Sequence, residues 1–160
     1  MKPEIVKCED VRAIGYEITD AEYKCCAETN CAYWTEVDFR KYPPYPAEMN
    51  NLGDVAVWMH PADDKEKLAY YYGTVTDLKA APEGFVEYTV PGGQYAVFTA
   101  TEDLLTDSPA ETARKVRECA SKAMSEWIGK EGYAYDKDNG MMYEFYKGGK
   151  ARIYIPVKKA

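Results

Sequence analysis

The chain of 160 residues lacks several features that would assign it quickly to a common functional class. It has one histidine, His60, and none of its five cysteines forms a C-x-x-C pair, so we expect no metal site. It has no apolar run near the ~20 residues of a membrane-spanning helix, and its first residues, MKPEIVKCED, contain no apolar signal core. We therefore expect a cytoplasmic protein without membrane contact.

Positive charge is also scarce. The chain carries 20 Lys and Arg residues against 27 Asp and Glu residues, which gives a net charge of −7. Phosphate backbones would be repelled, and no basic cluster interleaved with aromatics offsets this, so we expect no direct binding of nucleic acid. The motifs G-x-G-x-x-G, H-E-x-x-H and G-x-S-x-G are absent, and no cofactor is predicted.

Tyrosine is the dominant aromatic residue, with 15 Tyr against 4 Phe. Tyrosine rings often have one polar end exposed at binding surfaces, but tyrosine is also a common strand residue. A hydrophobic fraction of 46% supports one core in a chain of this length, so we treat residues 1–160 as a single domain.

Two helices are predicted from capping boxes, in which a hydroxyl and a carboxylate three residues later satisfy free backbone N–H groups. One begins at Thr19, with Glu22, and ends before the segment KYPPYP; the other begins at Ser108, with Glu111, and is stopped by Gly129. Runs of β-branched and aromatic residues predict strands at 11–18, 54–60, 68–77, 86–90, 94–100, 141–147 and 151–157.

The predicted elements have the same order in both halves of the chain: a strand, a capped helix and an aromatic hairpin. We interpret this order as a duplication, with one repeat over about residues 1–80 and the other over about 81–160. The predicted fold class is α+β: two βαββ units form one curved antiparallel sheet, with both helices on one face and a groove where the units meet.

Glu144 is the residue with the clearest chemical signal, because it lies inside the apolar and aromatic run MMYEFY. Burying an unpaired carboxylate is costly, so Glu144 either faces water or has a function. Strand alternation places Met142 and Tyr146 on its face. If the duplication holds, further rings from neighbouring strands share that face: Trp58, Tyr70, Tyr72 and Tyr154.

Rings around an acid suit a flat, apolar and often cationic organic ligand. Each ring face attracts a cation by about 0.5–2 kcal/mol, and the carboxylate supplies the counter-charge. For any single tyrosine, a position in the ordinary core fits the local sequence equally well.

Several motifs of the chain resemble the GyrI-like family, also called AraC-type effector-binding domains. The matching residues are Gly73, Pro82-Glu83-Gly84-Phe85, Pro91 to Phe98, Glu144-Phe145-Tyr146 and Tyr154-Ile155-Pro156. The resemblance implies two βαββ repeats with a ligand groove on their pseudo-twofold axis. It also implies that Glu144 is the acid at the bottom of the pocket, that Tyr154 is a pocket tyrosine, and that the ligands are small organic molecules, frequently cationic and aromatic.

Many relatives are fused to a helix-turn-helix reader of DNA and regulate transcription, but here the sensor-like part fills the whole sequence. We therefore expect a stand-alone small-molecule-binding protein of multidrug type. Two alternatives stay open. The resemblance also fits a hydrolase of cyclopropane-bearing electrophiles, in which Glu144 activates water and Tyr72 or Tyr154 donates a proton. It fits as well an inhibitor that acts on a protein partner, as gyrase-inhibitor relatives do.

Overall fold

The computed structural model describes residues 2–18, 22–26, 31–36, 38–59, 69–100, 109–136, 138–139 and 141–160. Its main element is a curled antiparallel sheet with the strand order β1-β8-β11-β10-β5-β6-β2-β7. The strands of this sheet are β1 (Glu4–Cys8), β2 (Val11–Ile18), β5 (Asp54–Met59), β6 (Ala69–Val75), β7 (Val86–Val90), β8 (Gly93–Ala100), β10 (Tyr143–Lys147) and β11 (Lys150–Lys159). The short strand β9 (Tyr133–Tyr135) pairs with the end of β11.

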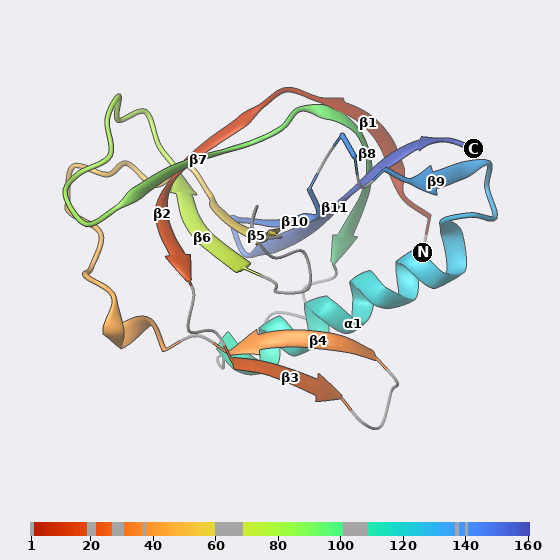
Figure 1. Cartoon of the computed structure of the whole chain (residues 1–160), viewed down its shortest axis with the longest axis horizontal. Helices are drawn as coiled ribbons and strands as arrows, with labels where there is room; N and C mark the ends of the chain where they lie inside the picture. The colour runs from red at the N-terminus through yellow and green to blue at the C-terminus, as the bar shows by residue number, and fades with distance from the viewer. Residues whose placement is uncertain are drawn as a thin grey trace.

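The sheet curls until its two ends meet (Figure 1). β1 pairs with β8 and β2 pairs with β7 in one continuous register, with Glu4 opposite Val97, Cys8 opposite Gly93, Val11 opposite Val90 and Gly15 opposite Val86. β2 also pairs with β6, and β8 also pairs with β11. The strands therefore form a barrel-like ring.

The strand order is symmetrical about the central β5–β10 pair. β6, β2 and β7 follow on one side, and β11, β8 and β1 follow on the other. Helix α1 (Pro109–Trp127) follows β8 in the second half, and the hairpin of β3 (Glu22–Cys26) and β4 (Cys31–Glu36) follows β2 in the first half. A duplicated unit would produce this strand order, and the duplication itself stays a prediction.

The prediction of a helix that begins at Thr19 is wrong. Residues 22–26 and 31–36 form an antiparallel hairpin instead, with Glu22 opposite Glu36, while Thr19 lies outside the described residues. A capping box is a local signal, and the aromatic and β-branched residues in the run CAYWTE suit a strand. In the described part of the chain one α-helix, rather than two, lies against the sheet.

The other predicted elements are confirmed, with shifts of a few residues at their ends. α1 begins at Pro109 and ends at Trp127, and Gly129 follows with a positive φ of 84°. The seven predicted strands are all present, although His60 and the charged loop after it lie outside the described residues. The strands β1 and β9 were not predicted. No helix in the described part of the chain combines the length and the apolar character needed to cross a membrane.

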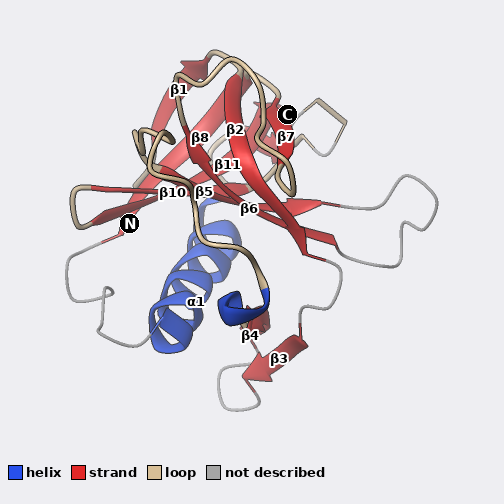
Figure 2. Ribbon diagram, turned by 90° about the vertical axis from the view of Figure 1, so that its left-hand side faces the viewer, coloured by secondary structure: helices blue, strands red, loops and turns tan. Residues whose placement is uncertain are grey.

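The two faces of the sheet are both packed. The inner face of the ring contains Val55, Val57, Tyr71, Tyr95 and Tyr143. The outer face packs against the apolar side of α1, and its buried residues include Ala56, Phe98, Ile153 and Ile155 from the sheet and Val116, Ala120 and Trp127 from the helix. Figure 1 and Figure 2 both show α1 and the β3–β4 hairpin on this outer side.

Two glycines allow β2 and β6 to pack closely. Gly15 and Gly73 are register partners, and a Cβ on Gly15 would lie 2.2 Å from the carbonyl oxygen of Tyr72. A Cβ on Gly73 would lie 2.7 Å from the ring of Tyr71. The glycine of the family motif therefore makes room for a neighbouring tyrosine ring.

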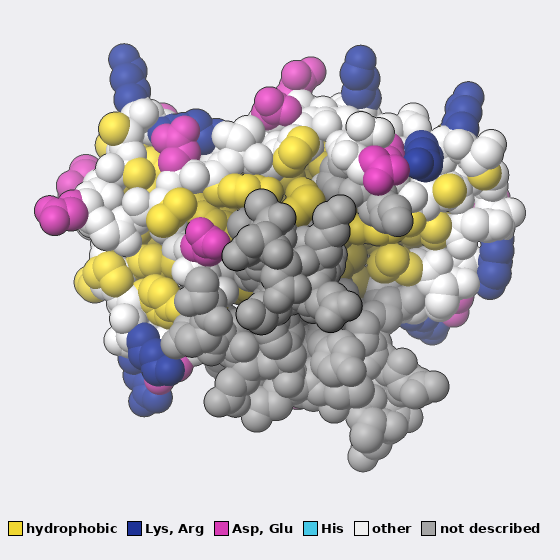
Figure 3. Space-filling model, viewed as in Figure 1, with side chains coloured by type: hydrophobic (Ala, Val, Ile, Leu, Met, Phe, Trp, Pro, Cys, Tyr) yellow, Lys and Arg dark blue, Asp and Glu magenta, His cyan; other side chains and the backbone are white. Residues whose placement is uncertain are grey.

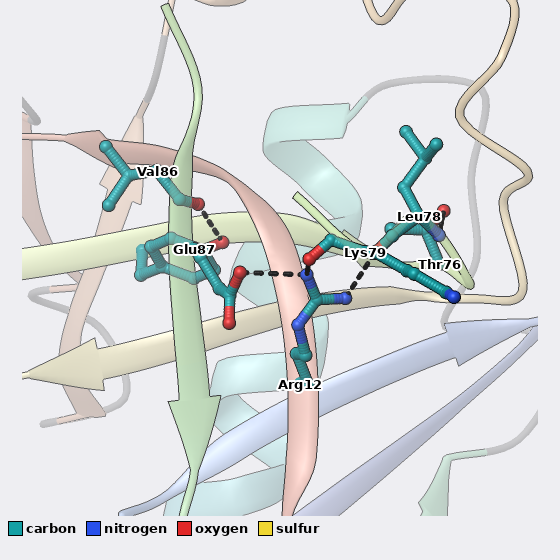
Figure 4. A network of polar contacts seen from close by, with 7 residues as sticks. Arg12, Thr76, Leu78, Lys79, Val86 and Glu87 are labelled. Atoms are coloured by element: carbon teal, nitrogen blue, oxygen red, sulfur yellow. Dashed lines mark hydrogen bonds and ion pairs between the residues drawn. The ribbon is translucent and has the colours of Figure 1, made fainter. Parts of the chain in front are cut away.

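Arg12 connects β2 to the loop between β6 and β7 (Figure 4). Its guanidinium donates to the backbone carbonyls of Leu78 at 2.6 Å and Lys79 at 3.0 Å, and it pairs with the Glu87 carboxylate at 2.8 Å. This loop leads into Phe85, whose ring packs against the aromatic cluster described below. Arg12 therefore holds the loop that carries this ring.

Arg12→Ala is expected to lower the free energy of unfolding by about 1–2 kcal/mol, because it removes a charge-assisted hydrogen bond and two bonds to backbone carbonyls. Equilibrium unfolding in urea, followed by circular dichroism, measures the change. Arg40→Ala is the control, since Arg40 has a side chain 90% exposed and pairs with Asp38 two residues away. Equal losses for both variants would contradict the role of Arg12.

Candidate ligand-binding site

The strands β10, β5 and β6 bring the candidate residues together on the outer face of the sheet. Ala56 of β5 lies opposite Glu144 of β10 on one side and opposite Tyr72 of β6 on the other. Asp54, two residues earlier on β5, lies opposite Tyr146. Side chains alternate along a strand, so all five residues share one face. The small side chain of Ala56 leaves no large group between Glu144 and Tyr72.

Glu144 is buried, with 5% of its surface exposed. Its Oε2 atom accepts a hydrogen bond from the hydroxyl of Tyr146 at 2.7 Å. Burial raises the pKa of Tyr146 well above its usual value, and the nearby Glu144 carboxylate raises it further. Tyr146 therefore stays protonated and donates a hydrogen bond to the buried carboxylate of Glu144.

A second carboxylate, Asp54, lies beside this pair and was not among the predicted site residues. Asp54 is half-buried and accepts hydrogen bonds from Tyr72 and, at 3.0 Å, from the side-chain amide of Asn51. Burial raises the pKa of Asp54 in spite of these bonds. Burial also raises the pKa of Tyr72, and the charges of Asp54 and Glu144 act in the same direction. Tyr72 thus lies within electrostatic reach of both acids.

A pocket of about 540 Å³ opens beside Tyr72, within the size range of small-molecule sites. Its walls come from β2, β6 and the segment before β5, namely Tyr16, Arg40, Tyr42, Pro43, Pro44, Tyr45 and Tyr72. Arg40 is the one cation among these lining residues, and Asp38 pairs with it at 2.7 Å. Figure 3 shows hydrophobic side chains across the middle of the face seen in Figure 1, with most charged side chains around the periphery.

The aromatic wall of the pocket is centred on Tyr16. The ring of Tyr45 stacks on Tyr16 at 5.3 Å with 13° between the planes. The centroids of the Tyr42 and Phe85 rings lie 4.9 Å and 5.2 Å from the centroid of the same ring. The hydroxyl of Tyr16 donates to the carbonyl of Pro43, which ties the segment YPPY to β2.

The structure brings most of the predicted site residues together. Tyr70, Tyr72, Tyr146 and Met142 all belong to the outer-face cluster that includes Ala56. Trp58 occupies the ladder position opposite Tyr70, and its side chain lies outside the described part of the structure.

Tyr154 lies on the other face of the sheet. Its register partner is Tyr143, and the two rings stack at 4.4 Å with 8° between their planes. The residue opposite Glu144 on β11 is Ile153. The prediction that Tyr154 shares the face of Glu144 is therefore wrong, since the register between β10 and β11 shifts Tyr154 to the inside of the ring.

Sequence reasoning missed the pocket wall. Local pattern places Tyr42 and Tyr45 in a segment that ends a helix, and Tyr16 in a strand, without indicating a pocket. Tyrosines that flank a Pro-Pro pair are a usable signal, because the prolines stiffen the segment and hold both rings. Phe85 was named only as part of the family motif, with no role in the pocket.

The curled antiparallel sheet with a helix on its outer side is the GyrI-like α+β fold of effector-binding domains. The chain belongs to the Cass2 family, described as integron-associated effector binding proteins, whose sequence profile matches residues 4–157. Family membership supports a small-molecule-binding role.

Among solved structures, the chain is similar to integron cassette protein VCH_CASS2 from the mobile metagenome of Vibrio cholerae. The TM-score is 0.54 and the sequence identity 14%, over 99% of this chain and 97% of that one. A likeness at this identity concerns the fold. No curated protein sequence matched.

Tyr45→Phe is expected to raise the free energy of unfolding by about 1 kcal/mol. The hydroxyl of Tyr45 is buried without a hydrogen-bond partner, and such a group costs on the order of 1–3 kcal/mol. Differential scanning calorimetry should show a higher Tm. The control is Tyr71→Phe, which should lower the Tm because the hydroxyl of Tyr71 donates to the Val86 carbonyl at 2.8 Å. A lower Tm for Tyr45→Phe would contradict the conclusion that the hydroxyl of Tyr45 is buried without a hydrogen bond to the described residues.

Asp54 is expected to take up its proton at a higher pH than an exposed aspartate, because burial raises its pKa above the ordinary 3.8. The folded chain then binds this proton more tightly than the unfolded chain. The contribution of Asp54 to stability therefore falls as the pH rises from below the unfolded pKa to above the folded pKa. Asp54→Asn should remove this fall, as measured by urea unfolding at a series of pH values. A carboxyl NMR titration that places the Asp54 midpoint below the ordinary value would overturn the expectation.

Proposed function

We propose that this chain is a small-molecule-binding protein of multidrug type that captures flat, lipophilic aromatic cations beside Glu144. The observation that carries the proposal is the buried carboxylate of Glu144 on the same sheet face as a tyrosine-walled pocket. Tyr72 belongs to both, because it lines the pocket and lies within electrostatic reach of Glu144.

The charges around the site favour a cation. Asp54 adds a second carboxylate on the same face, and Arg40, the one cation among the described lining residues, is paired with Asp38. The whole chain has a net charge of −7, which attracts cations at long range. A tyrosine face adds about 0.5–2 kcal/mol of cation–π attraction, most when water is excluded.

The hydrogen bonds at the site favour binding over hydrolysis. A hydrolase would need a proton donor for the leaving group in addition to Glu144 as the base. The hydroxyl of Tyr146 donates to Glu144, the hydroxyl of Tyr72 donates to Asp54, and Tyr154 lies on the other face. Repeated turnover of a cyclopropane-bearing alkylating compound, detected as a water adduct by mass spectrometry, would favour the enzyme instead.

Glu144→Gln is expected to weaken the binding of naphthalen-2-ylmethyl-trimethylammonium at least about tenfold, which corresponds to about 1.4 kcal/mol. The reason is the loss of the counter-charge with little change in side-chain size. Isothermal titration calorimetry measures the affinity, for which we expect a Kd in the micromolar range.

The matched control for this experiment is Glu126→Gln, which removes an exposed carboxylate from α1 and should leave the Kd unchanged. The proposal fails if the two glutamine variants bind the probe as tightly as the original chain.

A further inference from the structure

We use the term acidic face for the outer-face patch formed by Glu144, Asp54, Tyr146 and Tyr72. Each of its two phenol hydroxyls has a single hydrogen, and the structure shows where both hydrogens go. Tyr146 donates to Glu144 at 2.7 Å, and Tyr72 donates to Asp54. A hydroxyl that has already donated its hydrogen can only accept from any further partner. Toward a ligand, the oxygens of Tyr146 and Tyr72 are therefore hydrogen-bond acceptors.

The two carboxylates have the same character. An ionised carboxylate has no hydrogen to donate and can accept several hydrogen bonds. Glu144 and Asp54 therefore add acceptors beside the two phenol oxygens, and register places all four residues on one sheet face. The Arg40 guanidinium at the pocket donates to Asp38, and its side chain is 90% exposed. The acidic face thus offers oxygen acceptors and needs a ligand that supplies hydrogens.

We propose that this face selects cations that carry N–H groups, such as primary ammonium or amidinium ions, over quaternary ammonium ions of similar shape. Tyr72, which lines the pocket and is oriented by Asp54, is the selecting residue. The inference rests on the proposed function and deepens it, because it names the kind of cation that the site prefers.

The rings and the oxygens of the site act differently on the two kinds of cation. Ring faces attract both through cation–π interactions, so the aromatic wall discriminates little. A quaternary ion has no hydrogen to donate, whereas an N–H cation forms charge-assisted hydrogen bonds with carboxylate and phenol oxygens. These bonds also offset the greater cost of removing an N–H cation from water.

The test compares naphthalen-2-ylmethylammonium with its N,N,N-trimethyl counterpart on the full chain by isothermal titration calorimetry. The measured quantity is the ratio of the two dissociation constants, because the three methyl groups add apolar contact that affects each variant equally. We expect the original chain to favour the primary ammonium, and Tyr72→Phe to reduce this preference by about fivefold or more, since it keeps the ring and removes the acceptor oxygen.

Asp54→Ala is the second variant, and it leaves the phenol of Tyr72 intact. The variant removes the Asp54 acceptor and leaves the Tyr72 hydroxyl unoriented, so the preference should fall although the phenol oxygen is still present. Tyr71→Phe is the control, since its ring belongs to the inner face, and it should leave the ratio unchanged. A Tm measured for each variant shows that it is folded.

The outcomes separate this inference from the proposed function. If Glu144→Gln weakens both ions while Tyr72→Phe and Asp54→Ala leave the ratio unchanged, the selection of N–H cations is overturned and cation binding stands. If Glu144→Gln weakens neither ion, both proposals fail. A chain that favours the quaternary ion before any substitution also overturns the selection.

Discussion

A carboxylate that is removed from water has to accept hydrogen bonds from the protein, and on this sheet tyrosines supply them. Glu144 accepts a hydrogen bond from Tyr146, two residues further along β10. Asp54 accepts one from Tyr72 on the neighbouring strand β6. The bonds fix the hydroxyl ends of the rings and supply each acid with a hydrogen-bond donor. The placement of aromatic rings beside two acids on this face depends on this pairing.

The abundance of tyrosine has two separate causes in this fold. Inside the ring, Tyr71 and Tyr95 fill space and end in bonds to the backbone carbonyls of Val86 and Pro91. On the outer face, Tyr16 and Tyr72 stand at a pocket, where ring and hydroxyl can meet a ligand. Tyrosine therefore fills the inside of the ring and also lines the pocket on the outer face, and composition alone does not separate the two positions.

Local pattern predicted much of the fold, although the capping box at Thr19 predicted a helix where the chain forms the β3–β4 hairpin, and it did not predict long-range pairing. Strand alternation and the cap at Ser108 located most of the sheet and α1, and an acid within an apolar run identified Glu144. The face of Tyr154 depends on the β10–β11 register, which family resemblance did not supply. Asp54 lies at the start of a strand, where polar residues are common. Its place in the site follows from a hydrogen bond with Tyr72, which belongs to another strand.

The ladder that closes the ring links the first strands of the chain to strands from its middle, as the pairing of Glu4 with Val97 shows. Bringing such distant segments together costs loop-closure entropy before their contacts can stabilise the structure. We therefore expect the ring to close slowly and late in folding. The first strand of each half also pairs with a strand of the other half: β1 pairs with β8, and β7 pairs with β2. A separated half would lack the strand that the other half contributes. It would also lack one acid–tyrosine pair, because Asp54 and Tyr72 lie in the first half and Glu144 and Tyr146 in the second. The two acids and their tyrosines therefore share one sheet face only once the strands of both halves have paired.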